Sequence, residues 1–564
     1  MIVADPKHSP GQQPDVTYNV ATAHKTSPKD RLIHGARALA RRVVRWPTRA
    51  FLRGLCTVDG MLHAAPPIDT DKQKSRVMST AQAKKAGLPV VRASTPVPVL
   101  RAGKKTRIFL LNPPRYCGIP VARFYRSEYL FVDEHAIPST DLAYFAAAAR
   151  DLADVALTEA NAEDISNEEV MRRIEAFQPD VIVLKALINV MEHDLTVPLA
   201  YKQAHPHVTV VACSRSSIGA EAKILAEFPG LDGIARGEVD AFAADLAADP
   251  RLEGPIDGLF TRDRPTSVTR VVEDLDRHPI PAFEMMPRVW YRGAQSGAAH
   301  GFSSAYFGAP SGYYVIASRG CPYTCTYCMT GGIDGRPFRM RKRSPENVVE
   351  EIRQLHAYGI KDFYFFDEIF TMPGHAEPIC EAIIASGLKV HFVCDGKPDL
   401  VTPEMLRLMK AAGCVAIYHG VESGDPGILK DVRKGQEAGH AAKAIKMTQA
   451  AGMLAATYIT IGYPNETWQT YLNTVGFLLE TKPDMVRYGF LTPYPITVLH
   501  KQMKDAGLLL EGMEHSDRRI SPFHDAAIPI RSKALGPRTL QIMDALLKHT
   551  FSTELARTPM IASE

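Results

Sequence analysis

Two series of short apolar segments alternate with helical segments along most of the chain, and this alternation limits the folds that the chain can adopt. Strands that are each followed by a helix form parallel sheets, because the helix carries the chain back to the start of the next strand. The first series runs from residue 107 to about 249, and the second from 313 to about 500. We therefore expect two α/β domains built on parallel sheets.

The first series contains five candidate strands with helical stretches between them. In the stretch NEEVMRRIEAF, Val170, Ile174 and Phe177 fall on one face, as expected of a helix that packs on a sheet. Five strands connected in this way predict a doubly wound parallel sheet. The strand candidates are RIFLLN, DVALTEA, DVIVLKAL, VTVVACS and DGIAR.

The second series contains six candidate strands. The helix that follows the first of them opens with Ser344, Pro345 and Glu346, which are an N-cap residue, a proline at the first helical position and an early acid. Six strand–helix units with right-handed crossovers predict a partial parallel (β/α)6 barrel. The strand candidates are GYYVIAS, DFYFFDE, LKVHFVC, CVAIYHGVE, LAATYITIG and DMVRYGFL.

The segments outside the two series are less regular. The basic stretch from Lys25 to Arg53 predicts a solvated arm, with a membrane surface or an acidic partner as the alternative. The segment LQIMDALLKHTF predicts one helix close to the end of the chain. The resulting division is an irregular basic arm (1–105), a doubly wound domain (106–255), a connector (256–310), a barrel (311–507) and a helical tail (508–564).

Composition excludes some classes of function. With 46% hydrophobic and 23% charged residues, the 564-residue chain has the composition of a globular protein with a sizeable core. A net charge of +4 is too small to predict binding to nucleic acid. The chain has no uninterrupted apolar run of the ~18–20 residues that a membrane span needs, and its start does not have the layout of a secretory signal. We therefore expect a cytoplasmic protein without a transmembrane segment or a nucleic-acid partner.

Three cysteines, Cys321, Cys325 and Cys328, occur within eight residues directly after the first strand of the second series. Thiolates are the usual ligands of iron–sulfur clusters, which normally take four of them. Three thiolates from one loop can hold three corners of a cluster and leave one iron open to a chelating molecule. A structural zinc site would need a fourth ligand, and a thioredoxin-like pair would not need a third cysteine. The pattern therefore predicts an iron–sulfur cluster with one open iron.

The pattern CxxxCxΦC, with the aromatic Tyr327 before the last cysteine, resembles the radical S-adenosylmethionine (SAM) superfamily. The resemblance implies that the three cysteines hold a 4Fe–4S cluster as catalytic and metal-binding residues, and that SAM chelates the open iron. It implies that Tyr327 and the backbone at Met329 contact the adenine of SAM. It also implies a one-electron donor, such as flavodoxin or ferredoxin.

Further motifs in residues 313–500 resemble the same family. They are similar to the second-strand motif (FYFFDEIF), the fourth-strand motif (AAGCVAIYHGVESG), the fifth-strand Gly–Pro–Glu motif (ITIGYPNET) and the sixth-strand TPYPGT motif (LTPYPITVL, with Ile496 in place of glycine). Barrel enzymes build their sites at the carboxyl ends of strands, where these motifs lie. The resemblance implies cofactor-binding roles for Asp367, Glu368, Glu422, Ser423, Gly462 and Glu466.

Some of these residues also have a purely structural interpretation. Glu422 would then cap the next helix, and Glu466 would be an acid at a helix N-terminus. The same alternative applies to the pair Asp367 and Glu368. His419 and Cys394 also lie near strand ends, and we expect both to be buried without binding a cofactor.

The first series resembles the cobalamin-binding domain of class B radical SAM enzymes. The matching segments are LLNPP, PDVIVLKAL and GIARGEVDAF, followed by the linker DLDRHPIPAFEMM. The resemblance implies that Asn112 and Pro113 contact cobalamin at the carboxyl end of the first strand. The chain has Ala212-Cys213-Ser214-Arg215 where the family has Gly-Gly. It also lacks the DxHxxG motif, which supplies a histidine ligand to cobalt, so no histidine is expected on the lower face of the corrin. A degenerate domain without the cofactor is the alternative.

The resemblance as a whole implies a cobalamin-dependent radical SAM methyltransferase. Its substrate would be an unactivated centre of a small, natural-product or pigment-like metabolite. One SAM molecule would supply the methyl group through cobalamin, and a second would be cleaved to a radical that takes a hydrogen atom from the substrate. A cobalamin-containing radical SAM cyclase or rearrangement enzyme is the first alternative. A non-catalytic sensor of cobalamin or SAM is the second, and the intact cysteine motif argues against it.

Overall fold

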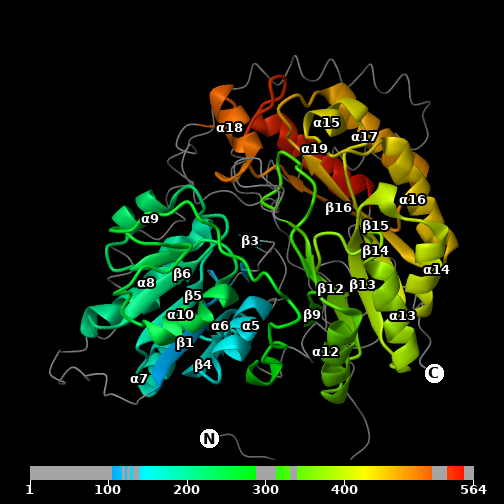
Figure 1. Ribbon diagram of the computed structural model, residues 1–564. Helices are drawn as coiled ribbons and strands as arrows, with labels where there is room; N and C mark the ends of the chain where they lie inside the picture. Colours follow the sequence, from blue (N-terminus) through cyan, green and yellow to red (C-terminus); the bar gives the residue numbers. More distant parts are fainter. Residues whose placement is uncertain are drawn as a thin grey trace, which may run out of the picture. The chain divides into compact units, whose positions relative to one another are not determined.

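The computed structural model describes residues 105–116, 118, 121–123, 128–130, 139–286, 313–330, 339–510 and 530–551, all of which belong to one compact unit. They form two six-stranded sheets and two short ribbons (Figure 1). The predicted basic arm lies outside the described residues, except for Lys105. None of the helices in the described ranges is long and apolar enough to cross a membrane.

The first sheet has the strand order β4-β1-β5-β6-β7-β8, in which the first five strands are parallel and β8 is antiparallel to β7. All five predicted strands are present. The strand order reverses between β1 and β5, and ligands of doubly wound folds bind at the carboxyl ends beside this point. The strands are β1 (Thr106–Asn112), β4 (Ala153–Glu159), β5 (Val181–Lys185), β6 (Thr209–Cys213), β7 (Gly233–Ala235) and β8 (Leu259–Phe260).

Helices cover both faces of this sheet because its strands are apolar on both sides. In β1, Ile108 and Leu110 enter one core, whereas Phe109 and Leu111 enter the other. A strand buried on both faces is typical of a doubly wound domain. The helices are α5 (Thr140–Ala149), α6 (Ala160–Glu163), α7 (Asn167–Phe177), α8 (Met191–Ala204), α9 (Glu221–Glu227) and α10 (Ala243–Ala248), with 3-10 turns η1 (Ile188–Val190), η2 (Val239–Phe242) and η3 (Phe283–Met285).

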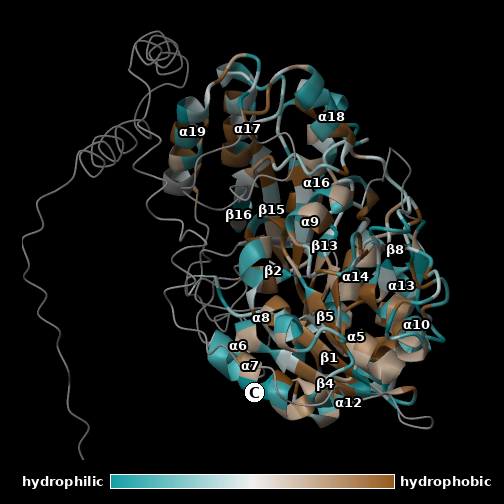
Figure 2. Cartoon of the chain, turned by 90° about the vertical axis from the view of Figure 1, so that its left-hand side faces the viewer, coloured by the Kyte–Doolittle hydropathy of each residue, from teal (hydrophilic) through white to brown (hydrophobic). Residues whose placement is uncertain are grey.

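The second sheet has the order β16-β15-β14-β13-β12-β9, and all of its strands are parallel. The order follows the sequence, as predicted for a partial barrel, and β9 and β16 form its two edges. Figure 2 shows that hydrophobic residues concentrate in the strands of both sheets. The strands are β9 (Tyr313–Val315), β12 (Asp362–Phe365), β13 (His391–Gly396), β14 (Cys414–Glu422), β15 (Leu454–Ile461) and β16 (Met485–Phe490).

The first barrel helix, α12, forms as its sequence predicts. The Ser344 hydroxyl accepts a hydrogen bond from the Asn347 backbone N–H at 3.3 Å, and Pro345 occupies the first turn. Ile352 and Leu355 are completely buried between the helix and the sheet. The barrel helices are α12 (Pro345–Ala357), α13 (Ala376–Ser386), α14 (Pro403–Ala411), α15 (Pro426–Asp431), α16 (Ala438–Ala450), α17 (Trp468–Thr481) and α18 (Val498–Asp505), with a 3-10 turn η5 (Pro398–Leu400).

The predicted helix of the tail is α19 (Pro537–Thr550). Its Leu540, Met543 and Leu547 are completely buried in the core that also contains Leu478 of α17. The helix packs against β16, the last strand of the barrel (Figure 1). It therefore covers the side of the barrel at an edge strand.

Two isoleucines on barrel helices test this packing. Ile352→Ala on α12 leaves a cavity at a site that is 0% exposed, and we expect it to cost about 2–5 kcal/mol. Ile384→Ala on α13 is the control, because this side chain is 43% exposed and its loss should cost within about 0.5 kcal/mol. The measurement is the midpoint of urea unfolding of the full chain. Equal shifts for the two variants would contradict the packing described here.

Candidate active site

The three cysteines lie in a loop that leaves a two-stranded antiparallel ribbon. The ribbon consists of β10 (Ser318–Arg319) and β11 (Arg341–Lys342), and Cys321 follows β10 after one glycine. That glycine, Gly320, has a φ of +89°, a conformation that glycine adopts without strain. The ribbon thereby aims the loop across the carboxyl ends of the barrel strands.

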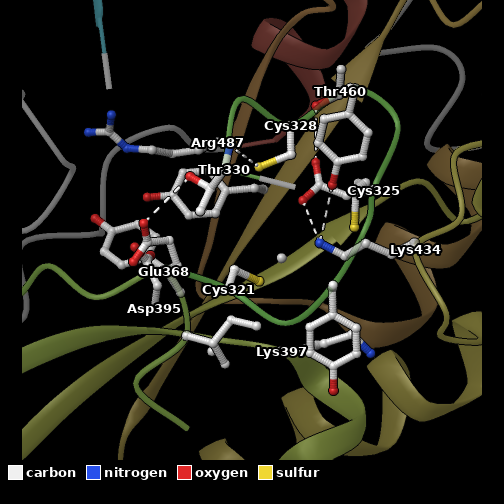
Figure 3. A pocket seen from close by; sticks show the side chains of 18 of the residues that line it. Cys321, Cys325, Cys328, Thr330, Glu368, Asp395, Lys397, Lys434, Thr460 and Arg487 are labelled. Carbon is white, nitrogen blue, oxygen red and sulfur yellow. Dashed lines mark hydrogen bonds and ion pairs between the residues drawn. The ribbon is translucent and has the colours of Figure 1, made fainter. Parts of the chain in front are cut away.

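Cys321, Cys325 and Cys328 line one cavity of about 360 Å³ (Figure 3). Most of the rest of its wall comes from the carboxyl halves of β12, β13, β14, β15 and β16 and the residues just after them, and Lys434 comes from the loop between α15 and α16. The cavity therefore occupies the position at which parallel barrels build active sites.

Backbone hydrogen bonds fix the middle of the cysteine loop. The Thr326 N–H donates to the carbonyl of Val432 at 3.0 Å, and the Leu499 N–H donates to the carbonyl of Thr326 at 2.9 Å. The Cys328 N–H donates to the carbonyl of Cys325 at 3.2 Å. The loop is thus bound to the segments after β14 and β16 as well as to itself, so the barrel determines where the thiols lie.

Glu368 joins the two ends of the same loop. Its carboxylate accepts a hydrogen bond from the Gly320 N–H at 3.1 Å and lies 3.5 Å from the Thr330 hydroxyl, which donates to it. Glu368 also lines the cavity, close to Cys321 (Figure 3). This residue, predicted to bind the cofactor, thus holds the loop that carries the thiols.

The donor set fits a cluster with an open iron. Within the described ranges, no three His, Cys, Asp or Glu side chains converge closely enough to share a single metal ion. The thiolates of a four-iron cluster bind separate corners, so they do not have to converge on one point. Three of the free cysteines in the described part of the chain line the cavity, and they would hold three irons and leave the fourth to SAM.

Burial raises the pKa of two of the thiols. It raises the pKa of Cys321 to about 12 and also raises the pKa of Cys325, although the nearby Lys434 opposes the shift of Cys325. Because thiols bind metals as thiolates, assembly of a cluster must release protons. The Thr330 N–H lies 3.3 Å from the sulfur of Cys328 and donates to it, and such hydrogen bonds help to set the reduction potential of a cluster.

A fixed ion pair forms the wall beside Cys325. The ammonium of Lys434 donates to Glu422 at 3.0 Å and to the Tyr327 hydroxyl at 3.3 Å, and the Thr460 hydroxyl donates to Glu422 at 3.1 Å. Burial alone would lower the pKa of Lys434, but the charges of Glu422 and Cys325 outweigh it and raise this pKa. Lys434 therefore keeps its charge at the edge of the cavity.

The backbone of Glu422 is strained. Its φ is +69°, which is unfavourable for a residue other than glycine, and the register between β14 and β15 shifts between Gly420 and Glu422. Strain of this kind persists only where the surroundings impose it, and it concentrates at functional sites. The irregular strand end directs the Glu422 carboxylate into the cavity.

Asp367, the neighbour of Glu368, lies outside the lining of the cavity. It is completely buried and accepts hydrogen bonds from the Ala317 N–H at 2.8 Å and the Ser318 hydroxyl at 2.7 Å. The imidazole of His375 lies 2.7 Å from the same carboxylate. Asp367 thus holds the start of the ribbon against the end of β12, and its predicted contact with the cofactor stays a prediction.

Ser423, Gly462 and Glu466 hold turns that follow strands and also lie outside the lining of the cavity. The Ser423 hydroxyl accepts from the Asp425 N–H at 3.1 Å. The buried Glu466 accepts from the N–H groups of Gly462 and, at 3.2 Å, Tyr463, and burial raises its pKa to about 7. The structure gives these three residues local roles, and their predicted contacts with the cofactor remain untested.

Met329 packs away from the cavity lining. It is 8% exposed and forms a small apolar cluster with Ile218 of the first domain and Ile496 after β16. Ile496 replaces the glycine of the family's TPYPGT motif, and here its side chain fills the space beside the cysteine loop.

His419 and Cys394 are buried, as expected. The His419 imidazole is 3.0 Å from the Thr448 hydroxyl on α16, and burial lowers its pKa to about 3. Cys394 packs in the core of the barrel with Cys380 and Cys414.

The cavity also contains polar residues that the sequence analysis missed. Alternate residues of a strand face the same side, and Tyr418 lies four residues before Glu422 in β14. Counting back from Glu422 in steps of two would therefore have located Tyr418 in the cavity. Arg487 of β16 also lies in the lining, and no predicted site residue on that strand pointed to it. Lys397 and Lys434 come from loops, and no sequence pattern marked them.

Asn112 and Pro113 lie at the carboxyl end of β1, where the corrin contact is predicted. The Asn112 amide donates to Glu159 at 2.7 Å and accepts from Arg123 at 3.1 Å. Arg123 also donates to the carbonyl of Pro113 at 3.0 Å and forms a fully buried ion pair with Asp194. These contacts give the edge beside the switch point a fixed shape, and contact with cobalamin stays a prediction.

Comparison with known proteins agrees with this geometry. Residues 315–478 match the sequence model of the Radical SAM superfamily. An uncharacterised methyltransferase of Pyrococcus horikoshii is 29% identical over 383 residues, which is 66% of this chain and 80% of that protein. The anaerobic magnesium-protoporphyrin IX monomethyl ester cyclase of Synechocystis is 26% identical over 60% of this chain and 68% of its own length.

Among solved structures, the radical SAM methyltransferase TsrM of Kitasatospora setae, with tryptophan and a SAM analogue bound, is similar. Its TM-score is 0.56 at 17% identity, and the match covers 78% of this chain and 88% of TsrM. A second TsrM structure, with cobalamin and a [4Fe-4S] cluster bound, gives a TM-score of 0.53 at 16% identity over 77% of this chain and 80% of TsrM. At these identities the similarity shows the fold, and it confirms the predicted order of a doubly wound domain followed by a partial barrel.

An open parallel barrel with three thiols at its carboxyl edge, preceded by a doubly wound domain, defines a class of enzymes that use an iron–sulfur cluster. Within that class, the barrel of this chain is a radical SAM domain, matched over residues 315–478. Its cofactors are accordingly a 4Fe–4S cluster and SAM. Its substrate is a small molecule, and an electron donor reduces the cluster.

Replacing the three cavity cysteines together tests the cluster site. Anaerobically reconstituted wild-type protein should carry about four iron atoms that can be reduced to a paramagnetic state. The Cys321→Ala/Cys325→Ala/Cys328→Ala variant should lose them, because no thiolates remain to hold the corners. Cys394→Ala is the control and should keep the wild-type iron content, since this thiol packs in the core. Full iron content in the triple variant would refute the assignment.

Proposed function

We propose that the chain is a cobalamin-dependent radical SAM methyltransferase that methylates an unactivated centre of a small metabolite. The observation that carries this proposal is the presence, in one chain, of the three-thiol cavity and a doubly wound domain in contact with the loop that holds the thiols. The methyltransferase of P. horikoshii and the cobalamin-bound TsrM support it.

The cofactors supply the chemistry and the protein supplies the positions. When bound, the cluster provides the electron that cleaves SAM, and cobalamin carries the methyl group. Cys321, Cys325 and Cys328 would hold the cluster, and Glu368 keeps their loop closed at both ends. These three thiolates would leave one corner of the cluster open to the amino and carboxylate groups of SAM.

The walls of the cavity would orient SAM. The ion pair of Lys434 and Glu422 offers a donor and an acceptor to the polar groups of SAM beside Cys325. Tyr418 and Tyr458, whose rings stack with centroids 5.2 Å apart, line the cavity with apolar surface. Such a wall limits access of water to a reactive intermediate.

Other parts of the proposal rest on the sequence. The substrate would bind between the doubly wound domain and the mouth of the barrel, because ligand pockets commonly form where two domains meet. A flavodoxin or ferredoxin as electron donor, and a cytoplasmic location, stay predictions.

A cobalamin-containing cyclase is the second candidate. The similarity to the Synechocystis cyclase, at 26% identity, favours it. A cyclase and a methyltransferase need the same cluster cavity, so the cavity alone does not distinguish them. The intact thiol set argues against the third alternative, a sensor without catalytic activity.

The products distinguish methyl transfer from cyclisation. With reductant, SAM, cobalamin and the true substrate, we expect a product that has gained one methyl group, together with both S-adenosylhomocysteine and 5′-deoxyadenosine. The first by-product reports donation of the methyl group, and the second reports hydrogen abstraction. Mass spectrometry measures all three. An unmethylated product formed with 5′-deoxyadenosine alone would favour the cyclase and would leave the cluster assignment intact.

Cobalamin binding has a separate optical test. Protein loaded with hydroxocobalamin should show the spectrum of a corrin without histidine on its lower face. His193, which lies beside the carboxyl end of β1, has its Nε2 atom 3.2 Å from the carbonyl of Pro114. His193→Ala should therefore leave the spectrum unchanged. Protein that takes up no corrin would refute this part of the proposal, and a change of spectrum in His193→Ala would refute the absence of a histidine ligand.

A further inference from the structure

The ribbon that carries the cysteine loop places two arginines directly opposite each other. Arg319 of β10 pairs with Arg341 of β11 in the antiparallel register. Like charges at opposing positions of a ribbon destabilise it unless they are neutralised. Both arginines are also buried, with side chains that are 5% exposed. The ribbon can therefore form only with carboxylates between and beside its arginines.

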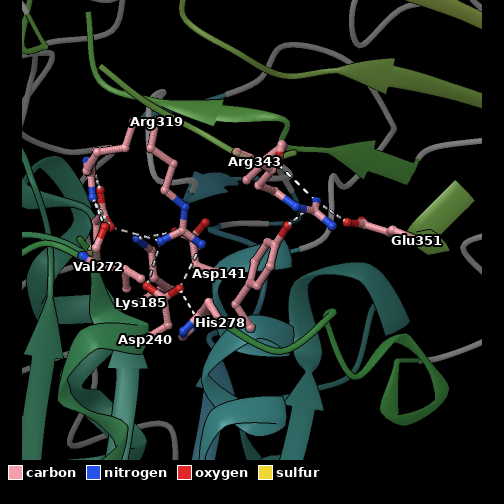
Figure 4. A network of polar contacts seen from close by, with 12 residues as sticks. Asp141, Lys185, Asp240, Val272, His278, Arg319, Arg343 and Glu351 are labelled. Atoms are coloured by element: carbon pink, nitrogen blue, oxygen red, sulfur yellow. Dashed lines mark hydrogen bonds and ion pairs between the residues drawn. The ribbon is translucent and has the colours of Figure 1, made fainter. Parts of the chain in front are cut away.

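Those carboxylates come from the doubly wound domain. Glu238, which follows β7, accepts from Arg319 at 3.0 Å and from Arg341 at 2.6 Å and 3.1 Å. Asp240 in η2 accepts two hydrogen bonds from Arg319, at 2.7 Å and 3.1 Å. We call Glu238, Asp240, Arg319 and Arg341 the interdomain clamp, part of which is drawn in Figure 4.

The clamp is charged despite its burial. Burial alone would raise the pKa of Asp240, but the charge of Arg319 and the hydrogen bond and charge of His278 outweigh it and hold this pKa below its usual range. The pKa of Glu238 is lowered in the same way by Arg319 and Arg341. Buried ion pairs of this kind contribute little net stability, and in some proteins they serve to fix one arrangement of the chain.

The doubly wound domain also contacts the other end of the cysteine loop. Arg319 lies two residues before Cys321, and Met329 directly follows Cys328. Met329 packs against Ile218 of the segment between β6 and α9. The segment from Cys321 to Cys328 is thus held on both sides by residues that follow strands of the first sheet.

We propose that the interdomain clamp positions the cysteine loop, with Arg319 as the positioning residue that acts through Cys321. The clamp would set the place of the cluster, and hence of SAM on its open iron, relative to the carboxyl edge of the doubly wound domain. This inference rests on the proposed function for its purpose, because methyl transfer needs the cluster and the corrin in a fixed arrangement. The contacts that carry it are independent of that function.

The test measures how SAM binds to the reduced cluster in the full chain, without cobalamin or a methyl acceptor. Arg319→Gln should keep its iron but should need a roughly tenfold higher SAM concentration to change the paramagnetic spectrum of the cluster, since small displacements of a site carry large penalties. Uncoupled formation of 5′-deoxyadenosine at fixed SAM should fall in parallel. Full iron with a wild-type response to SAM would overturn the proposal.

Asp240→Asn provides a second variant in which the cysteine loop and its ribbon are unchanged in sequence. It should weaken the SAM response in the same direction. The double variant Arg319→Gln/Asp240→Asn should be no worse than the more severe single variant, because the two residues act through one contact. Additive effects would mean that Asp240 acts elsewhere and would overturn the proposal. If Arg319→Gln fails to assemble a cluster, a wild-type response in Asp240→Asn overturns it.

Arg236→Met is the matched control. Arg236 lies on the same loop as Glu238 and forms a buried ion pair with Glu221 inside the doubly wound domain. Its loss should leave the SAM response of the cluster unchanged. An equal loss of response in this variant would show that general loosening of the domain causes the effect, and would refute the clamp. Failure to bind cobalamin or to methylate a substrate would contradict the proposed function without changing these readouts.

Discussion

Parallel pairing of the barrel strands is the constraint on which the site depends. Because β12 to β16 run in the same direction, the residues that follow them meet at one edge of the sheet. Glu368, Lys397 and Glu422 come from three such strand ends and line one cavity with the three thiols. The sheet thereby brings together side chains that are far apart in the sequence.

The polar groups at this edge are stable only in pairs. A charge removed from water costs several kcal/mol unless a partner compensates it. Lys434 therefore accompanies Glu422 at the cavity, and Glu238 accompanies Arg319 behind it. Each ion pair also fixes the positions of its two partners, so the pairs that compensate the buried charges also help to hold the cysteine loop in place. Glu238 belongs to the doubly wound domain and Arg319 to the ribbon before the loop, so their ion pair also joins the two domains.

The two neighbours Asp367 and Glu368 show where sequence analysis reaches its limit. Both follow β12 and both were predicted to bind the cofactor. In the structure, Glu368 lines the cavity, whereas Asp367 holds the ribbon through Ala317 and Ser318. Two adjacent carboxylates are chemically equivalent in a motif, and the twist of the chain after the strand decides which one faces the cavity.

The sequence by itself determined the parallel strands of both sheets, the helices between them and the spacing of the thiols along the chain, because these depend on local patterns. Apolar runs set both sheets, Ser344 and Pro345 set the start of α12, and the cysteine spacing indicated an open cluster site. Only the tertiary structure decided the partners of those residues. Lys434 meets Glu422, and Arg319 meets Asp240, through contacts between distant segments. Such contacts depend on how whole elements pack, and no local pattern in the sequence records that packing.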